Sequence, residues 1–138
     1  MKKQVIIMCT GNSCRSQIAE GYLRHLARDK YNVVSAGLEP SMVNPRAIQV
    51  MAEHGIDISG HTSKAVDLFL NQKFDYIITV CDHAKERCPF FPGSGKRIHW
   101  SFRDPAAATG SETEIMEVFR SVRDQIRKRL IEFANDTD

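Results

Sequence analysis

Two spacings of apolar residues alternate along this chain. Residues 5–8 are apolar without a break and mostly β-branched, which is typical of a strand covered on both faces. Residues 18–26 carry apolar side chains three or four positions apart, the spacing of an amphipathic helix. Strands are expected at residues 4–8, 32–37, 75–80 and 97–100, and helices at 16–29, 45–55 and 111–134. A short helix, capped by Thr62 or Ser63, is expected to run through residue 70. This alternation predicts a parallel α/β sheet with helices on both faces.

Capping residues mark where two of the helices begin. Asn44 before Pro45 is a strong helix start, because the amide caps the first turn and proline suits the first helical position. Ser111 with Glu114 three residues later forms a capping box. The last helix is expected to end before residue 135, with a frayed tail after it.

The segment that joins the first strand to the first helix, residues 9–16, is here called the anion loop. Its sequence is Cys9-Thr10-Gly11-Asn12-Ser13-Cys14-Arg15-Ser16. Small residues between a strand and a helix collect unpaired backbone N–H groups beside the positive end of the helix dipole, which favours an anion. Gly11 and Asn12 tolerate the backbone angles that such a loop needs.

Three side chains of the anion loop suggest its chemistry. Arg15 offers a planar fork of donors for two oxygens of a tetrahedral oxyanion. The same donors stabilise a thiolate, so Cys9 is a candidate nucleophile, and Ser16 can donate to its sulfur. The alternative, in which Cys9 is a small buried residue and Arg15 a surface charge, is disfavoured because the strand and helix supply the context that the mechanism needs.

Composition limits the other possibilities. A chain of 138 residues with 42% hydrophobic and 26% charged residues is typical of one soluble globular domain. The net charge of +2 favours neither nucleic acid nor a membrane surface as a partner. No apolar run approaches the ~18 residues of a membrane span. A cytoplasmic protein, monomeric because nothing indicates an obligate interface, is therefore expected.

The four cysteines, Cys9, Cys14, Cys81 and Cys88, follow no common zinc spacing, so no metal is expected. In a cytosolic protein they are more often catalytic or redox-active than structural. Cys81 follows the third predicted strand and Asp104 follows the fourth. Because parallel strands end at one edge of a sheet, Cys9, Cys81 and Asp104 should lie at the same edge.

Residues 81–88, here called the redox segment, are bracketed by two thiols. If the segment is helical, its cysteines are about 10 Å apart along the axis. A disulfide requires α-carbons within roughly 7 Å, so the helix would have to unwind to form one. Hydrolysis of a phosphate ester in the anion loop would need only Cys9, Arg15 and an acid. Cys81 and Cys88 would have no role in that reaction.

These features resemble the thioredoxin-coupled arsenate reductases, which share the fold of low-molecular-weight protein tyrosine phosphatases. The shared motifs are residues 9–17, 35–37, 44–45, 57–59, 61–63, 79–81, 88–89, 99–100, 104–105 and 122–124. The resemblance covers essentially the whole chain. It implies a three-layer α/β/α fold with a central four-stranded parallel sheet, formed by a single domain over residues 1–138.

The resemblance also implies a mechanism. Arsenate, or phosphate or sulfate as competitors, would bind the side chain of Arg15 and the backbone N–H groups of the loop, which is formed by Thr10, Gly11, Asn12, Ser13, Cys14 and Arg15. Cys9 would attack arsenic while Asp104 protonates the departing oxygen. Cys81 would then attack Cys9, and Cys88 would attack Cys81, leaving a redox disulfide for thioredoxin. No cofactor is implied, and weak phosphatase activity is expected. Cys14 is expected to be only a small loop residue.

The same residues are compatible with two other functions and with other electron donors. The runner-up is a phosphatase acting on phosphotyrosine or small phosphomonoesters, although residues 106–108 are alanines where such enzymes often place an aromatic. A redox sensor without turnover is a third class. The electron donor could also be glutaredoxin with glutathione or another thiol.

One departure from the resemblance concerns a cation. Some relatives hold potassium with residues matching Asn12, Glu20 and Ser35, plus an aspartate where this chain has Lys64. The ammonium of Lys64 is expected to replace that ion by pairing with Glu20 or a neighbour. His61 has no partner that its spacing identifies.

Overall fold

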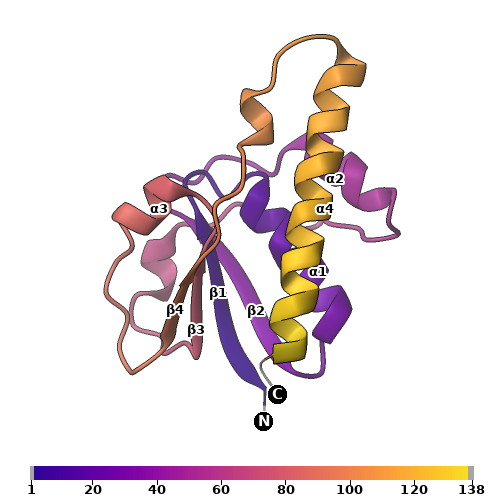
Figure 1. Ribbon diagram of the computed structural model, residues 1–138. Helices are drawn as coiled ribbons and strands as arrows, with labels where there is room; N and C mark the ends of the chain where they lie inside the picture. Colours follow the sequence, from indigo (N-terminus) through magenta and orange to yellow (C-terminus); the bar gives the residue numbers. More distant parts are fainter. Residues whose placement is uncertain (1, 137–138) are drawn as a thin grey trace.

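A computed structural model describes residues 2–136 and contains the expected sheet (Figure 1). The strands are β1 (Lys3–Cys9), β2 (Tyr31–Gly37), β3 (Tyr76–Thr79) and β4 (Lys96–His99). All neighbours are parallel and the order is β2-β1-β3-β4. In the register, Cys9 lies beside Gly37. The sheet therefore delivers the anion loop to its carboxyl edge, next to the end of β2.

Helices cover one face of the sheet and shorter elements lie on the other (Figure 1). The first face carries α1 (Arg15–Ala27), α2 (Pro45–Ala52) and α4 (Glu112–Asp136), with α4 packed on both α1 and α2. The 3-10 turn η1 (Val66–Phe69) packs on the second face, while α3 (Asp82–Glu86) follows β3 at the carboxyl edge. The predicted cap of η1 by Thr62 or Ser63 is wrong, because the turn begins after Ala65 and the Ser63 hydroxyl binds Gly11 and Ser41 instead. A further turn, η2 (Pro105–Ala107), precedes α4. The predicted three-layer α/β/α fold is confirmed.

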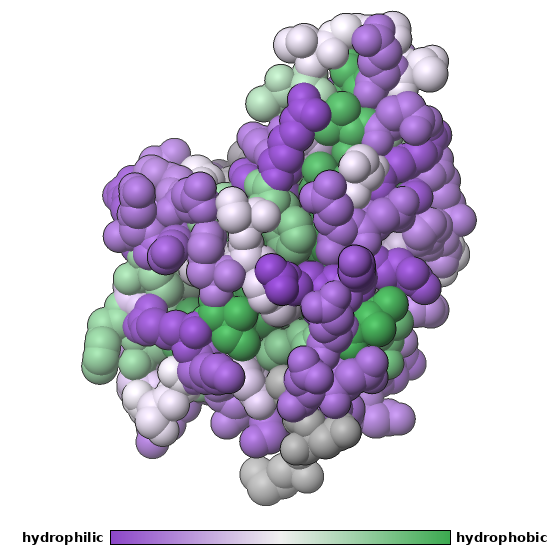
Figure 2. All heavy atoms as spheres, viewed as in Figure 1, coloured by the Kyte–Doolittle hydropathy of each residue, from purple (hydrophilic) through white to green (hydrophobic). Residues whose placement is uncertain are grey.

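The alternation of side chains in β1 explains both layers of the core. Val5 and Ile7 pack with α1 and α4, whereas Ile6 and Met8 pack with Val66 and the aromatic residues of the second face. All four are fully buried. Hydrophilic side chains cover most of the surface that α4 turns outward (Figure 2), as expected for an amphipathic helix. Within residues 2–136, no helix has the length and apolar character needed to cross a membrane.

The predicted helix starts are confirmed by their caps. Asn44 Oδ1 accepts from the Arg46 amide at 2.8 Å. Ser111 Oγ accepts from the Glu114 amide at 3.1 Å, and Glu114 Oε1 accepts in return from the Ser111 amide at 3.2 Å. These are the two halves of a capping box.

The prediction of a frayed tail from residue 135 is wrong for the part of the tail that is described. Helix α4 continues through Asp136. Its last turns are held because Phe133 packs against Tyr31 and Trp100, and because the Lys30 ammonium donates to the Ala134 carbonyl at 2.6 Å. Residues 137 and 138 of the predicted tail lie outside the described residues.

Candidate active site

The anion loop turns sharply between β1 and α1, and two residues make the turn possible. Asn12 has a φ of 48°, in the left-handed region that asparagine tolerates better than most residues. Gly37, at the end of β2, lies directly behind the loop. A Cβ on Gly37 would come within 2.6 Å of the Thr10 carbonyl oxygen and 2.8 Å of the Asn12 nitrogen. Only glycine at position 37 lets the loop lie this close to the sheet.

Two side chains, one from α1 and one from a distant segment, hold carbonyls of the loop in place. Ser63 Oγ donates to the Gly11 carbonyl at 2.9 Å. Gln17 Nε2 donates both to the Asn12 carbonyl at 3.1 Å and to the Thr62 carbonyl at 2.9 Å. With its carbonyls bound from outside, the loop keeps a fixed shape. Sequence spacing gave no indication of the contact from Ser63, because Ser63 lies about fifty positions from the loop.

The sulfur of Cys9 is buried and shares a hydrogen bond with Ser16 Oγ at 2.8 Å. Asn12 Nδ2 donates to the same Ser16 oxygen at 2.8 Å. Because that oxygen already accepts from Asn12, the Ser16 proton is free to point at the sulfur. The expected donation from Ser16 to Cys9 is therefore supported by the geometry.

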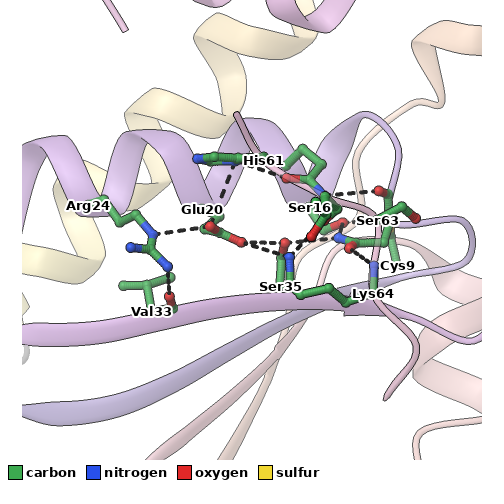
Figure 3. Close-up of polar contacts among 12 residues, drawn as sticks. Cys9, Ser16, Glu20, Arg24, Val33, Ser35, His61, Ser63 and Lys64 are labelled. Carbon is green, nitrogen blue, oxygen red and sulfur yellow. Dashed lines mark hydrogen bonds and ion pairs between the residues drawn. The ribbon is translucent and has the colours of Figure 1, made fainter. Parts of the chain in front are cut away.

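The hydrogen bonds continue from Asn12 to the buried carboxylate of Glu20, which lies beside Ser35 in Figure 3. The second proton of Asn12 Nδ2 is donated to Ser35 Oγ at 2.9 Å, and Ser35 donates to Glu20 Oε1 at 2.5 Å. Asn12 Oδ1 accepts from the backbone amide of Lys64 at 2.8 Å, which fixes the orientation of the side-chain amide. One uninterrupted network thus joins Glu20 to the candidate nucleophile.

Glu20 is buried with a side-chain exposure of 4%, and three cationic or titratable groups surround it (Figure 3). Arg24 Nε lies 3.1 Å from Oε2, His61 Nδ1 lies 3.7 Å from Oε2, and Lys64 Nζ lies 3.7 Å from Oε1. Burial lowers the pKa of His61, although Glu20 opposes the shift. His61 also contacts Gln17 Oε1 at 3.0 Å, so it does have partners that its spacing did not reveal.

The position of Lys64 bears on the potassium site of some relatives. The Lys64 ammonium lies beside the carboxylate that would bind the ion and also donates to the Thr62 carbonyl at 2.8 Å. A positive charge beside Glu20 opposes a second cation there. The residues around Glu20 therefore do not fit a potassium ion.

We expect the catalytic rate of the protein to be the same in potassium and sodium buffers of equal ionic strength, because the positive charge of Lys64 already balances the negative charge of Glu20. The Lys64→Asp variant, which restores the aspartate of some relatives, should become dependent on potassium. Initial rates measured in both salts test this expectation. Clear activation of the unmodified protein by potassium would contradict it.

Arg15 of the anion loop and Asp104 form a long ion pair. Arg15 NH2 lies 3.9 Å from Asp104 Oδ2, and its NH1 donates to the Phe102 carbonyl at 3.0 Å. The Asp104 side chain is 46% exposed, and its Oδ1 accepts from the Ala106 amide at 3.0 Å, capping η2. The carboxylate thus lies at the surface beside Arg15 of the anion loop, where a general acid could reach a departing oxygen.

Cys81 lies at the same edge of the sheet, as predicted. It is buried, and its sulfur lies 3.4 Å from Thr10 Oγ1 of the anion loop. The sulfur also accepts from the Ala84 amide at 3.4 Å and so caps α3. The second thiol therefore contacts the loop that holds the first.

Cys88 and Cys14 stand apart from this pair. Cys88 follows the end of α3 and is half-buried, and its sulfur accepts from Arg97 NH1 at 2.9 Å. Burial raises the pKa of the Cys14 thiol to about 12, which suits the expected role of a small loop residue rather than a nucleophile. All four cysteines are free thiols, so this is the reduced conformation.

Comparison with known proteins identifies the family. Residues 4–138 match the family of low molecular weight phosphotyrosine protein phosphatases. The chain is 50% identical to the arsenate reductase of Halalkalibacterium halodurans over 133 residues, which are 96% of each chain. A solved structure of an arsenate reductase in the phosphate binding state has a TM-score of 0.80 and 36% identity, with both chains fully covered. The tyrosine phosphatase AmsI of Erwinia amylovora, 21% identical, shares the fold with a TM-score of 0.79 over 98% of this chain and 93% of its own. The chain therefore belongs to the low molecular weight phosphotyrosine protein phosphatase family, and its near relatives there include proteins named arsenate reductase.

Proposed function

We propose that the protein is an arsenate reductase that passes electrons along Cys9, Cys81 and Cys88. The observation that carries the proposal is the contact between the Cys81 sulfur and Thr10, which puts a second thiol against the oxyanion loop. Hydrolysis of a phosphate ester has no use for that thiol. Reduction of arsenic needs one, because an electron pair must come from a second sulfur.

The proposed reaction begins in the anion loop, where backbone N–H groups and Arg15 bind the arsenate oxygens. The Cys9 thiolate attacks arsenic, and Asp104 supplies the proton with which one oxygen leaves as water. Cys81 then attacks the Cys9 sulfur. The sulfur–arsenic bond breaks, arsenic takes its electron pair and leaves as arsenite, and a Cys9–Cys81 disulfide forms.

The remaining steps regenerate the nucleophile. Cys88 attacks Cys81, which releases the Cys9 thiol and leaves a Cys81–Cys88 disulfide. An external dithiol, proposed to be thioredoxin, reduces that disulfide and is itself oxidised to a disulfide. The cysteines supply both electrons, so the proposal includes no metal or organic cofactor. The proposed setting is the cytoplasm, and the proposed form is a monomer.

A coupled assay tests this function. Arsenate-dependent consumption of NADPH is measured with thioredoxin and thioredoxin reductase, and hydrolysis of para-nitrophenyl phosphate is measured beside it. We expect sustained NADPH consumption and only slow hydrolysis, since Cys9, Arg15 and Asp104 suffice for weak phosphatase activity. Brisk hydrolysis without NADPH consumption would instead make the protein a phosphatase.

The Asp104→Asn variant should lower arsenate turnover by about 10²- to 10³-fold, in the range of general acid catalysis. Asparagine keeps the oxygen that caps η2, so the fold should be unaffected. Initial rates are compared with those of Asp29→Asn, an exposed aspartate beyond the end of α1. The loss should be smaller for para-nitrophenyl phosphate, whose leaving group needs less protonation. An equal loss with both substrates would argue against the acid role.

A further inference from the structure

We propose that β4 holds the redox segment in its reduced conformation, with Arg97 and His99 as positioning residues that set the reduction potential of the Cys81–Cys88 pair. This inference rests on the relay proposed above. Arg97 and His99 are two positions apart in one strand, so their side chains leave β4 on the same face. They contact opposite ends of the redox segment.

His99 holds the beginning of the segment. Its Nε2 lies 2.8 Å from Oδ1 of Asp82, the first residue of α3 and the direct neighbour of Cys81. The other ring nitrogen, Nδ1, lies 2.7 Å from Thr79 Oγ1 on β3. Because a carboxylate only accepts, Nε2 carries a proton and donates to Asp82, while Nδ1 pairs with the Thr79 hydroxyl. The ring is thus oriented by one strand and directed at α3.

Arg97 holds the end of the segment. Its NH1 donates to the Cys88 sulfur at 2.9 Å and its NH2 donates to the Pro89 carbonyl at 3.1 Å. The guanidinium therefore binds the thiol and the backbone beside it at the same time. Both bonds require Cys88 to stay where it is in the dithiol state.

A hollow of about 310 Å³ lies between the segment and β4, lined in part by Ile77, Lys85 and Ile98. Cys88, Arg97 and His99 line the same hollow. The polar contacts of Arg97 and His99 therefore run from β4 to the redox segment beside this hollow.

Forming the disulfide must disturb these contacts. Cys81 caps the start of α3 and Cys88 follows its end, so the two sulfurs are held at opposite ends of a helical turn. A disulfide needs α-carbons within roughly 7 Å, and the Cys88 sulfur must leave Arg97 to reach Cys81. Contacts made only by the dithiol favour the dithiol. They therefore raise the reduction potential and make the disulfide easier for a partner to reduce.

The test measures that potential directly. Proteins in a Cys9→Ser, Cys14→Ser background retain only Cys81 and Cys88, which are equilibrated with mixtures of oxidised and reduced glutathione. Two protein thiols and one oxidised glutathione give one disulfide and two reduced glutathiones. Thiol labelling and mass spectrometry then give the disulfide fraction.

Arg97→Gln and His99→Ala should each shift this equilibrium toward the disulfide by up to about tenfold, equivalent to a potential about 30 mV more negative. Lys96→Gln is the matched control, because it removes the same charge from the neighbouring position, whose side chain points to the other face of β4. Its potential should be unchanged. Thermal unfolding of each reduced protein checks the fold, and Arg97→Lys, which keeps the charge without the fork, replaces Arg97→Gln if that variant does not fold.

Two results would overturn the proposal in different ways. Unchanged potentials in both Arg97 and His99 variants, beside a normal disulfide in the background protein, would overturn the role of β4 and leave the relay intact. Absence of any Cys81–Cys88 disulfide in the background protein at every glutathione ratio would overturn the relay and this inference together. The double variant Asp82→Asn, His99→Ala should shift the reduction potential by less than the sum of the two single variants, since the two residues form one contact.

Discussion

Replacing Cys9 with serine should abolish both activities of the protein. Arsenate turnover and phosphate ester hydrolysis should each fall by about 10⁴-fold or more, because both need the same sulfur as nucleophile. The serine hydroxyl is smaller than the thiol and would fit the buried space that the sulfur fills beside Ser16. The fold should therefore persist. Steady-state rates of both reactions, measured on one preparation, check this result.

The matched control for this variant is Cys14→Ser in the same loop. Burial raises the pKa of the Cys14 thiol to about 12, so Cys14 has little thiolate at neutral pH and both activities should remain. Binding of phosphate to Cys9→Ser, measured by calorimetry, would show that the anion loop is still formed. Residual turnover in Cys9→Ser with full loss in Cys14→Ser would reverse the assignment of the nucleophile.

Replacing Cys81 or Cys88 with serine should separate reduction from hydrolysis. Multiple turnover of arsenate should fall by about 10³-fold or more in each variant, because each step of the relay needs its own thiol. Hydrolysis of para-nitrophenyl phosphate should stay close to normal, since neither sulfur belongs to the anion loop. The coupled assay and the hydrolysis assay, run side by side, measure both effects.

The two variants should also differ from each other. Cys88→Ser retains Cys81 against Thr10 and should release one arsenite per chain before it stops. Cys81→Ser lacks the thiol that attacks Cys9 and should release none. Equal loss of hydrolysis in both variants would indicate damage to the loop and would count against the relay.

Much of the fold could be predicted because its signals are local. The apolar run in β1 predicted a strand that is buried on both faces, and Asn44 and Ser111 predicted their helix starts from short-range hydrogen bonds. The placement of Cys9, Cys81 and Asp104 at one edge followed from the parallel order of the strands. The structure brings Cys81 to Thr10 and Asp104 to Arg15, in agreement with that placement.

Contacts between distant segments could not be predicted from spacing. Ser63 binds the Gly11 carbonyl, and His61 and Lys64 lie beside Glu20 from more than forty residues away. For Lys64, only the resemblance to relatives indicated its partner. Nothing in the local sequence distinguishes Arg97 from a solvated arginine on an edge strand, yet it donates to Cys88. These contacts depend on how the loops fold over the sheet, which no single stretch of sequence encodes.

The length of α4 shows the same limitation at the chain end. Polar residues near residue 135 suggested fraying, because local composition favoured it. Packing of Phe133 against aromatic side chains of the sheet keeps the last turns helical instead. Tertiary contacts here outweigh the local preference.

The most direct test of the relay is a single turnover by the Cys88→Ser variant. The reduced protein is mixed with one equivalent of arsenate, quenched with a thiol-alkylating reagent, digested, and its disulfides are mapped by mass spectrometry while arsenite is quantified. The relay predicts one Cys9–Cys81 disulfide and one arsenite per chain. Arsenite without that disulfide, or no arsenite from a protein that still hydrolyses para-nitrophenyl phosphate, would contradict it.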